Sequence, residues 1–119
     1  MNPAAPRDVD PGGGSMSGGP MSPDDFVEAV LATVEAIPPG KVMAYGDIAE
    51  LLGVGGPRQV GRVMSGHGGG VPWWRVIKAD GSPPPGHEVI AMREWIAEGT
   101  PLRPTGKVDM RRARWDGQP

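Results

Sequence analysis

Residues 46–65 read Gly-Asp-Ile-Ala-Glu-Leu-Leu-Gly-Val-Gly-Gly-Pro-Arg-Gln-Val-Gly-Arg-Val-Met-Ser, and this stretch decides the fold. Apolar residues recur at helical spacing at its start, which predicts a helix over Gly46–Leu52. The glycine-containing turn Gly53–Gly56 follows, and a proline suits the first position of a second helix, Pro57–Ser65. Two helices joined by such a turn are the helix-turn-helix pattern, in which the second helix is expected to meet DNA.

A helix is predicted on each side of this motif. Ser22 has the side chain of an N-cap, and apolar residues then recur at helical spacing as far as Ile37. Pro38–Gly40 ends this helix, and Glu88–Glu98 returns to helical spacing before Gly99 closes it. The predicted fold class is therefore mainly α: a small single domain with a helix-turn-helix (winged-helix-like) DNA-binding unit and short extended segments.

Two stretches, Lys41–Tyr45 and Pro72–Val76, are predicted to be extended. The second reads Pro-Trp-Trp-Arg-Val, and neighbouring side chains on a strand point to opposite faces. Trp73 and Trp74 therefore cannot both enter one apolar layer unless the strand is covered on both sides. One of the two indoles is a candidate for a role other than core packing.

Composition divides the chain into three parts. Residues 1–22 are mostly Gly, Pro, Ser and Met, and they bury too little apolar surface to offset the entropy of ordering, so a disordered tail is expected. Residues 23–102 form the predicted domain, and residues 103–119 are expected to be a basic C-terminal tail.

Charge is distributed unevenly, although the net charge of the 119 residues is only −2. Residues 1–40 carry one base and six acids, whereas residues 41–119 carry eleven bases and eight acids. The 29 residues from Leu51 to Ala79 carry four bases and no acid. Such a stretch suits a polyanionic partner, but it is also ordinary surface composition.

The sequence lacks the residues that several kinds of chemistry require. The chain has no cysteine, which excludes disulfides, thiolate metal sites and a cysteine nucleophile. His67 and His87 lie twenty residues apart without a Glu-x-x-His or Cys partner, so no metal or other cofactor is expected, and both are interpreted as solvated loop residues. With no secretory or membrane-spanning apolar run, a soluble, cytoplasmic monomer is expected.

Three segments in order, Ile37–Ala49, Pro57–Met64 and Pro72–Ile77, resemble the C-terminal DNA-binding domain of O6-alkylguanine-DNA alkyltransferases. The resemblance runs from about Asp24 to Gly99. Alkyltransferases carry Pro-Cys-His-Arg-Val, in which the cysteine takes the alkyl group from the damaged base. Here Trp73 stands in the place of that cysteine, as in alkyltransferase-like proteins. An indole cannot accept an alkyl group by displacement, so the resemblance implies binding without alkyl transfer.

The resemblance also implies roles for residues of the helix-turn-helix. Family members bind the minor groove through the second helix and flip the damaged nucleotide into a pocket. Arg58 matches the residue that fills the gap in the duplex, and Tyr45 matches the tyrosine that crowds the 3′ phosphate. Small Gly61 would face the groove. The expected DNA-binding residues are Tyr45, Arg58, Gln59, Gly61 and Arg62.

Trp73 would stack on the flipped base, a contact worth about 1–3 kcal/mol. The loop Ser82–Gly86 would be the lid of the pocket. Trp74 replaces the histidine that relays a proton to a glutamate, which Glu94 is taken to match, and its indole N–H could donate to Glu94. Arg75 is expected to hold the pocket strand. The expected pocket residues are Met43, Trp73, Trp74, Arg75, Ser82, Pro83, Gly86 and Glu94.

The predicted function is a non-enzymatic sensor that binds O6-alkylguanine in double-stranded DNA and presents it to nucleotide excision repair proteins. Two alternatives stay open. One is a helix-turn-helix protein that reads an undamaged sequence, although few side chains of the second helix suit base edges. The other is residual alkyl transfer or hydrolysis. Taken singly, Tyr45 also fits a core aromatic and Arg58 a solvated first-turn residue.

Overall fold

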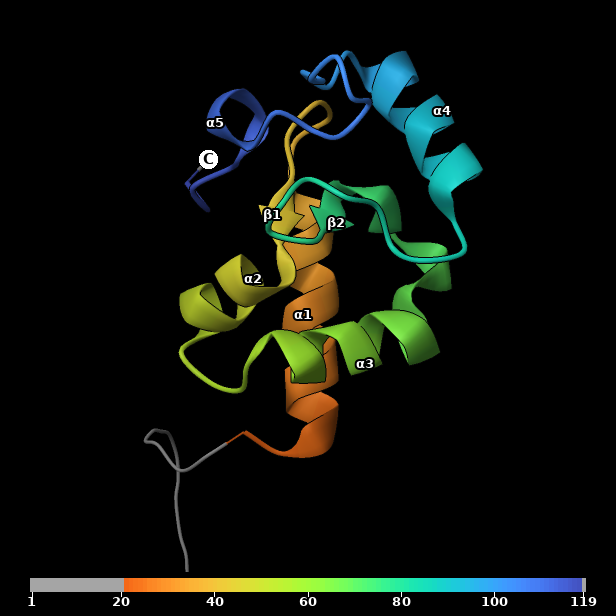
Figure 1. The fold of residues 1–119 in the computed structure, drawn as a ribbon. Coiled ribbons are helices and arrows are strands. Elements are labelled where there is room, and N and C mark those ends of the chain that lie inside the picture. The colour runs from red at the N-terminus through yellow and green to blue at the C-terminus, as the bar shows by residue number, and fades with distance from the viewer. Residues whose placement is uncertain (1–20, 119) are drawn as a thin grey trace, which may run out of the picture.

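The computed structural model describes residues 21–118 (Figure 1), so the predicted N-terminal tail, 1–22, lies outside the described residues except for its last two. Helices dominate within this range, which confirms the mainly α fold class. The helices are α1 (Pro23–Ala36), α2 (Tyr45–Leu52), α3 (Pro57–His67), α4 (Glu88–Glu98) and α5 (Met110–Ala113). The strands are β1 (Met43–Ala44) and β2 (Val76–Ile77), and single 3-10 turns lie at Gly68–Gly70 and Trp73–Arg75.

Helix α1 begins where the N-cap pattern predicts. The hydroxyl of Ser22 accepts a hydrogen bond from the backbone N–H of Asp25 at 3.1 Å, which satisfies one of the free donors of the first turn. Val30 and Val34 lie on the buried face of the helix. The apolar face of α1 therefore anchors the helix-turn-helix unit, which packs against it (Figure 1).

The helix-turn-helix is longer at both outer ends than predicted. Helix α2 starts at Tyr45, because the Asp47 carboxylate accepts the backbone N–H of Ala44 at 3.0 Å and caps the helix one residue earlier. Gly53 ends α2 in the left-handed region, at φ 76°, which glycine adopts without steric cost. Helix α3 continues to His67, two residues beyond the predicted end.

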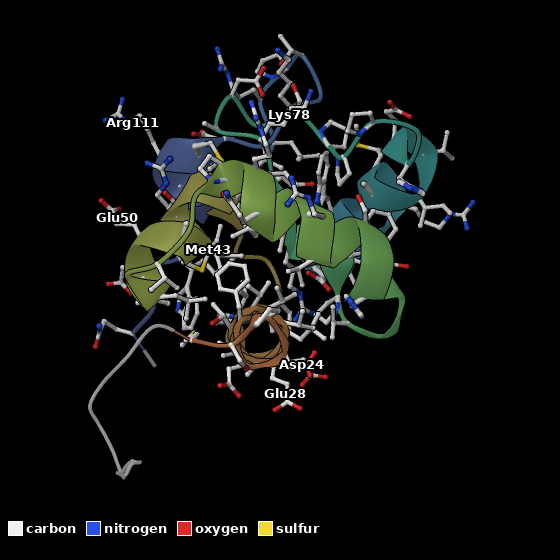
Figure 2. All side chains as sticks on the ribbon, turned by 90° about the horizontal axis from the view of Figure 1, so that it is seen from below. Asp24, Glu28, Met43, Glu50, Lys78 and Arg111 are labelled. Carbon is white, nitrogen blue, oxygen red and sulfur yellow. The ribbon has the colours of Figure 1, made fainter. Side chains whose placement is uncertain are left out.

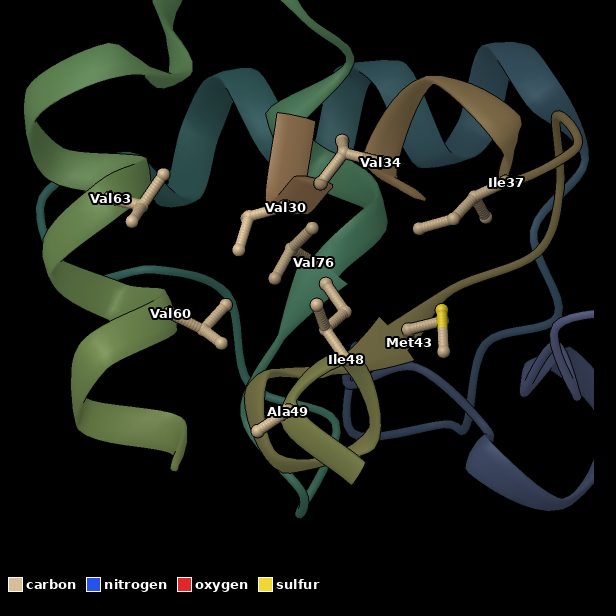
Figure 3. Packing of buried hydrophobic residues seen from close by; sticks show 9 residues of the cluster. All are labelled: Val30, Val34, Ile37, Met43, Ile48, Ala49, Val60, Val63 and Val76. Carbon is tan, nitrogen blue, oxygen red and sulfur yellow. The ribbon is translucent and has the colours of Figure 1, made fainter. Parts of the chain in front are cut away.

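Two buried clusters hold the domain together. In the first, Val60 and Val63 of α3 point toward Val30 of α1 and Val76 of β2 (Figure 3). The second joins the C-terminal part of the chain to α4 and β2. Its buried members are Val42, Ile77, Ala91, Trp95, Val108 and Ala113. Within the described residues, Val60 and Val63 of α3 are buried, whereas Arg58, Gln59 and Arg62 of the same helix are exposed. Within residues 21–118, no helix has the length and apolar character needed to cross a bilayer.

The Pro-Trp-Trp-Arg-Val stretch differs from the predicted strand. Trp73–Arg75 forms a 3-10 turn closed by the Arg75 N–H on the Pro72 carbonyl at 3.1 Å, and only Val76–Ile77 is extended, paired in parallel with β1. A 3-10 helix has three residues per turn, so neighbouring side chains leave the backbone about 120° apart. The side chains of Trp73 and Trp74 therefore point into different surroundings because of this turn. No strand that is covered on both faces is needed to place them.

The C-terminal segment also differs from the predicted basic tail. Val108 and Ala113 are fully buried, and Val42 bonds with the C-terminal segment through the Ala113 carbonyl at 2.9 Å and the Trp115 N–H at 2.8 Å. Composition averaged over 103–119 hides these apolar residues, because they are spaced among arginines and become a core only when the chain folds back on β1.

Candidate nucleic-acid interface

A pocket of about 430 Å³ opens beside α3, between the Trp73 turn, the proline-rich loop before α4, and the start of α4. This volume lies in the range of roughly 300–1,000 Å³ usual for small-molecule sites. The pocket is lined by Tyr45, Gly61, Met64, Ser65, Gly68, Gly69, Trp73, Pro84, Pro85, His87 and Ile90. Of the predicted pocket residues, the structure places Trp73 in its wall.

Tyr45 and Gly61 meet on the pocket wall, one from each helix of the motif. A Cβ built on Gly61 would lie 3.9 Å from the Tyr45 ring, in ordinary van der Waals contact. A methyl group therefore fits at position 61, and a longer side chain would extend into the pocket. Partial burial raises the pKa of the Tyr45 hydroxyl, so the group stays protonated at neutral pH and keeps its hydrogen-bond donor.

Arg58, Gln59 and Arg62 are exposed on α3, and this helix carries no acidic residue. The Gln59 side-chain oxygen accepts the backbone N–H of Gly56 at 2.9 Å, so the amide caps the helix as well as facing solvent. In Figure 2, Asp24 and Glu28 of α1 lie across α3 from Lys78. The charges of Asp24 and Glu28 thus lie apart from Lys78 in this view, and the exposed cations of α3 itself, Arg58 and Arg62, suit a polyanion.

The Trp73 ring is framed by two other rings. Its centroid lies 5.7 Å from that of Trp74, with the planes at 81°, and 5.3 Å from that of His87, with the planes at 56°. The interpretation of His87 as a solvated loop residue was incomplete: the residue is exposed, but its ring packs on Trp73 and lines the pocket. An aromatic ring just after the proline-rich loop Ser82–Gly86 was the sequence signal for this contact.

Trp74 turns away from the pocket toward the end of α4. Its indole N–H donates to Oε2 of Glu98 at 2.9 Å, and its carbonyl accepts the indole N–H of Trp95 at 2.8 Å. The prediction that Glu94 would take the indole hydrogen bond and line the pocket was wrong. Glu94 lies one turn earlier, and a shift of four residues keeps nearly the same helix face but moves a side chain about 6 Å along the axis. Only tertiary packing selects between the two.

Arg75 joins three segments of the chain. Its guanidinium donates to the Glu98 carboxylate, with Nη2 to Oε2 at 2.6 Å, and to the Ile37 carbonyl through Nη1 at 2.8 Å. The Gly40 N–H donates to the same carboxylate at 3.2 Å. Burial alone raises the pKa of Glu98, but the hydrogen bonds from Arg75, Trp74 and Gly40 outweigh it and hold this pKa below the usual value. Arg75 therefore holds the turn Trp73–Arg75 in place through contacts outside the pocket, and it does not line the pocket.

Met43, Ser82, Pro83 and Gly86 lie outside the pocket lining. Met43 is buried on β1 and borders a smaller cavity of about 300 Å³ on the far side of α2. The loop Ser82–Gly86 does reach the pocket, but through residues other than the predicted Ser82, Pro83 and Gly86. Ser82 closes a turn instead, since its backbone N–H donates to the Asp80 carboxylate at 2.9 Å. Two later residues of the loop, Pro84 and Pro85, line the pocket.

Sequence reasoning missed the rest of the lining. Met64 and Ser65 follow Gly61 by three and four residues, which places them one turn along the same helix face and was the available signal. Gly68, Gly69 and Ile90 come from neighbouring elements. Among residues 21–118, no three His, Asp or Glu side chains gather in a way that could hold a metal ion.

Residues 25–99 match the family described as "6-O-methylguanine DNA methyltransferase, DNA binding domain", and the chain belongs to this family. It is similar to the "DNA base-flipping protein" of Vibrio parahaemolyticus, with 33% identity over 97 residues that cover 77% of this chain and 97% of that protein. It is also similar to the "DNA base-flipping protein" of Escherichia coli, with 37% identity over 98 residues that cover 78% and 76% of the two chains.

Two solved structures share the fold. One is Schizosaccharomyces pombe Atl1 in complex with damaged DNA containing O6-carboxymethylguanine, with a TM-score of 0.71 and 31% identity. The other is the S. pombe protein in complex with DNA, with a TM-score of 0.68 and 31% identity. Each covers 83% of this chain and 100% of its own. The predicted resemblance to alkyltransferase-like proteins is therefore confirmed.

Proposed function

We propose that this protein recognises O6-alkylguanine in double-stranded DNA without acting on it as an enzyme. Helix α3 contacts the minor groove, the damaged nucleotide flips into the pocket beside it, and Trp73 stacks on the base. The observation that carries this proposal is the position of Trp73. It stands where the family's acceptor cysteine is expected, in the wall of a pocket of about 430 Å³ that α3 also lines.

The energetics favour a damaged nucleotide over an intact one. Flipping costs a few kcal/mol and costs least where pairing is already weakened. Stacking on Trp73 returns about 1–3 kcal/mol per base, and this gain does not depend on base identity. Selectivity therefore comes from the weakened pairing and from the substituent's fit in the pocket. Arg58 on the exposed face of α3 would fill the gap and hydrogen-bond the orphaned cytosine.

The residues of the pocket support binding rather than alkyl transfer. The chain has no cysteine, and an indole offers no nucleophile that a base could activate. Ser65 supplies a hydroxyl to the lining, but a serine needs an adjacent base to become a nucleophile. Within residues 21–118, no hydrogen bond joins Ser65 to His87, although both line the pocket.

A fluorescence-polarisation titration tests the proposal with two duplexes that differ only in one O6-methylated guanine. Salt must be fixed, because phosphate contacts make both affinities depend on it. Tighter binding of the methylated duplex, with no methyl found on the protein or lost from the base by mass spectrometry, is the expected result. Equal affinity for both duplexes would instead indicate a general or sequence-reading helix-turn-helix protein.

Presentation of the lesion to nucleotide excision repair proteins is the second part of the proposal. A protein that holds a lesion without removing it protects the organism only if another activity follows. Incision of the methylated duplex by a reconstituted excision nuclease is expected to rise when the protein is added. The unmethylated duplex is the control. Unchanged or reduced incision would count against this part alone.

A further inference from the structure

We infer that His87 determines which O6 substituents the pocket accepts, by favouring those that end in a hydrogen-bond acceptor, such as a carboxylate, over alkyl groups of similar length. This inference rests on the proposed function, because it concerns the base that Trp73 would stack. It goes further by naming the chemistry of the substituent and the residue that selects it.

The first observation is the position of His87. It is the last residue before α4, where the proline-rich loop ends, and its ring lies 5.3 Å from that of Trp73. Both rings line the same pocket. A base stacked on Trp73 would therefore lie beside His87, and a substituent that extends beyond O6 could reach the imidazole.

The second observation is the chemistry of the other lining residues. Among the described lining residues, Tyr45 and Ser65 bring hydroxyls and Trp73 an indole N–H besides the His87 imidazole, and the others are glycines, prolines, Met64 and Ile90. No lining residue is acidic, so an anionic substituent would meet no like charge inside the pocket. Of these four hydrogen-bonding side chains, the imidazole is the one that can carry a positive charge.

The third observation is that the His87 ring is open to a ligand. Within residues 21–118, no hydrogen bond occupies its ring nitrogens, and the residue is exposed. The neighbouring Glu88 carboxylate accepts the backbone N–H of Gly86 at 3.1 Å, and within residues 21–118 it forms no hydrogen bond with the imidazole. An imidazole carries at least one N–H donor in either protonation state, so it can serve an acceptor at any working pH.

The contribution of such a contact can be bounded. A hydrogen bond to a charged group contributes more than one between neutral groups, and an effect of about tenfold in affinity is reasonable for one such bond. Proline and isoleucine, which flank His87 in the pocket, offer no donor. Loss of the imidazole therefore leaves a polar substituent with the neutral donors of Tyr45, Ser65 and Trp73 and without a group that can carry a positive charge.

The test compares the full-length protein with its His87→Phe and His87→Gln variants. Phenylalanine keeps a ring on Trp73 and removes the donor, whereas glutamine keeps a donor and removes the ring. Each protein is titrated with four duplexes that differ in one guanine: unmodified, O6-methyl, O6-propyl and O6-carboxymethyl. His67→Phe is the matched control, because it makes the same change at an exposed histidine outside the pocket lining.

The wild-type protein and His67→Phe are expected to bind the carboxymethyl duplex about tenfold more tightly than the propyl duplex. His87→Phe loses this preference, measured as the ratio of the carboxymethyl and propyl affinities of the same protein, and His87→Gln recovers part of it. An unchanged carboxymethyl preference in His87→Phe overturns the inference. So does an equal loss of affinity for all three lesion duplexes in that variant. A carboxymethyl preference in His87→Gln that is no larger than in His87→Phe overturns it as well. If the wild-type protein binds no modified duplex more tightly than the unmodified one, the proposed function itself fails.

Discussion

The indole N–H of Trp74 lies 2.9 Å from Oε2 of Glu98 and donates a hydrogen bond to it. This contact ties the turn that carries Trp73 to the last turn of α4. Arg75 and Gly40 bond to the same carboxylate, so one acidic group holds three segments that are far apart in the sequence. The orientation of the pocket tryptophan therefore depends on a residue that does not line the pocket.

Replacing Glu98 with glutamine is expected to lower the free energy of unfolding by roughly 2 kcal/mol. The guanidinium of Arg75 would stay largely buried and lose its counter-charge, since both side chains of the ion pair are little exposed, at 13% and 12%. Urea denaturation measures the change. Glu94→Gln is the matched control, because Glu94 makes no part of this contact, and an equal loss in both variants would contradict the assignment.

The same carboxylate predicts a dependence of stability on pH. Because the folded-state pKa of Glu98 is lowered, its contribution is complete above the unfolded value of about 4.3 and is lost as pH falls through the folded-state pKa. The difference in unfolding free energy between the wild-type protein and Glu98→Gln should therefore shrink below about pH 4. Denaturation curves from pH 3 to 7 would show this, and a constant difference would refute it.

Replacing Trp73 with leucine should weaken binding of the O6-methylated duplex between about fivefold and a hundredfold, because it removes the stacking surface. Binding of the unmodified duplex should change much less, since α3 keeps its cations. Leucine retains apolar volume against the second cluster, so the fold is preserved. Polarisation titrations on both duplexes, with thermal denaturation as the folding control, decide the point. Equal weakening on both duplexes would show that Trp73 is only structural.

Replacing Arg58 with alanine should weaken binding of the lesion duplex at least tenfold, with little change in stability, because the side chain is exposed. Arg111→Ala, an exposed arginine of α5, should change affinity by less than about twofold. Tyr45→Ala should likewise reduce lesion binding more than it reduces stability. Titrations paired with denaturation curves measure both quantities. A similar effect of the two arginine variants would remove Arg58 from the interface.

Gly61 offers a graded test of the pocket. Gly61→Ala should raise stability by up to about 1 kcal/mol and leave lesion binding nearly unchanged, because its methyl meets the Tyr45 ring at an ordinary contact distance, 3.9 Å. Gly61→Leu should block the pocket and weaken binding of the O6-methylated duplex specifically. Lesion binding that survives in Gly61→Leu would show that the flipped base lies elsewhere.

Local chemistry made some elements predictable. The bounds of α4, Glu88–Glu98 with Gly99 as its cap, agree with the prediction, because the periodicity and the left-handed glycine are properties of neighbouring residues. The N-cap at Ser22 was predictable for the same reason. The motif order also identified Trp73 as a pocket residue. None of these inferences needed a contact between distant segments.

Tertiary contacts decided the rest. The sequence by itself determined the helices, the helix-turn-helix and the place of Trp73, because these depend on spacing along the chain. Only the tertiary structure decided that Trp73–Arg75 forms a turn, that Glu98 rather than Glu94 meets Trp74, and that His87 joins the pocket. Helical periodicity predicts which face of a helix a side chain lies on, but it does not predict which residue that side chain contacts. The contact partner depends on how α4 packs against the rest of the domain.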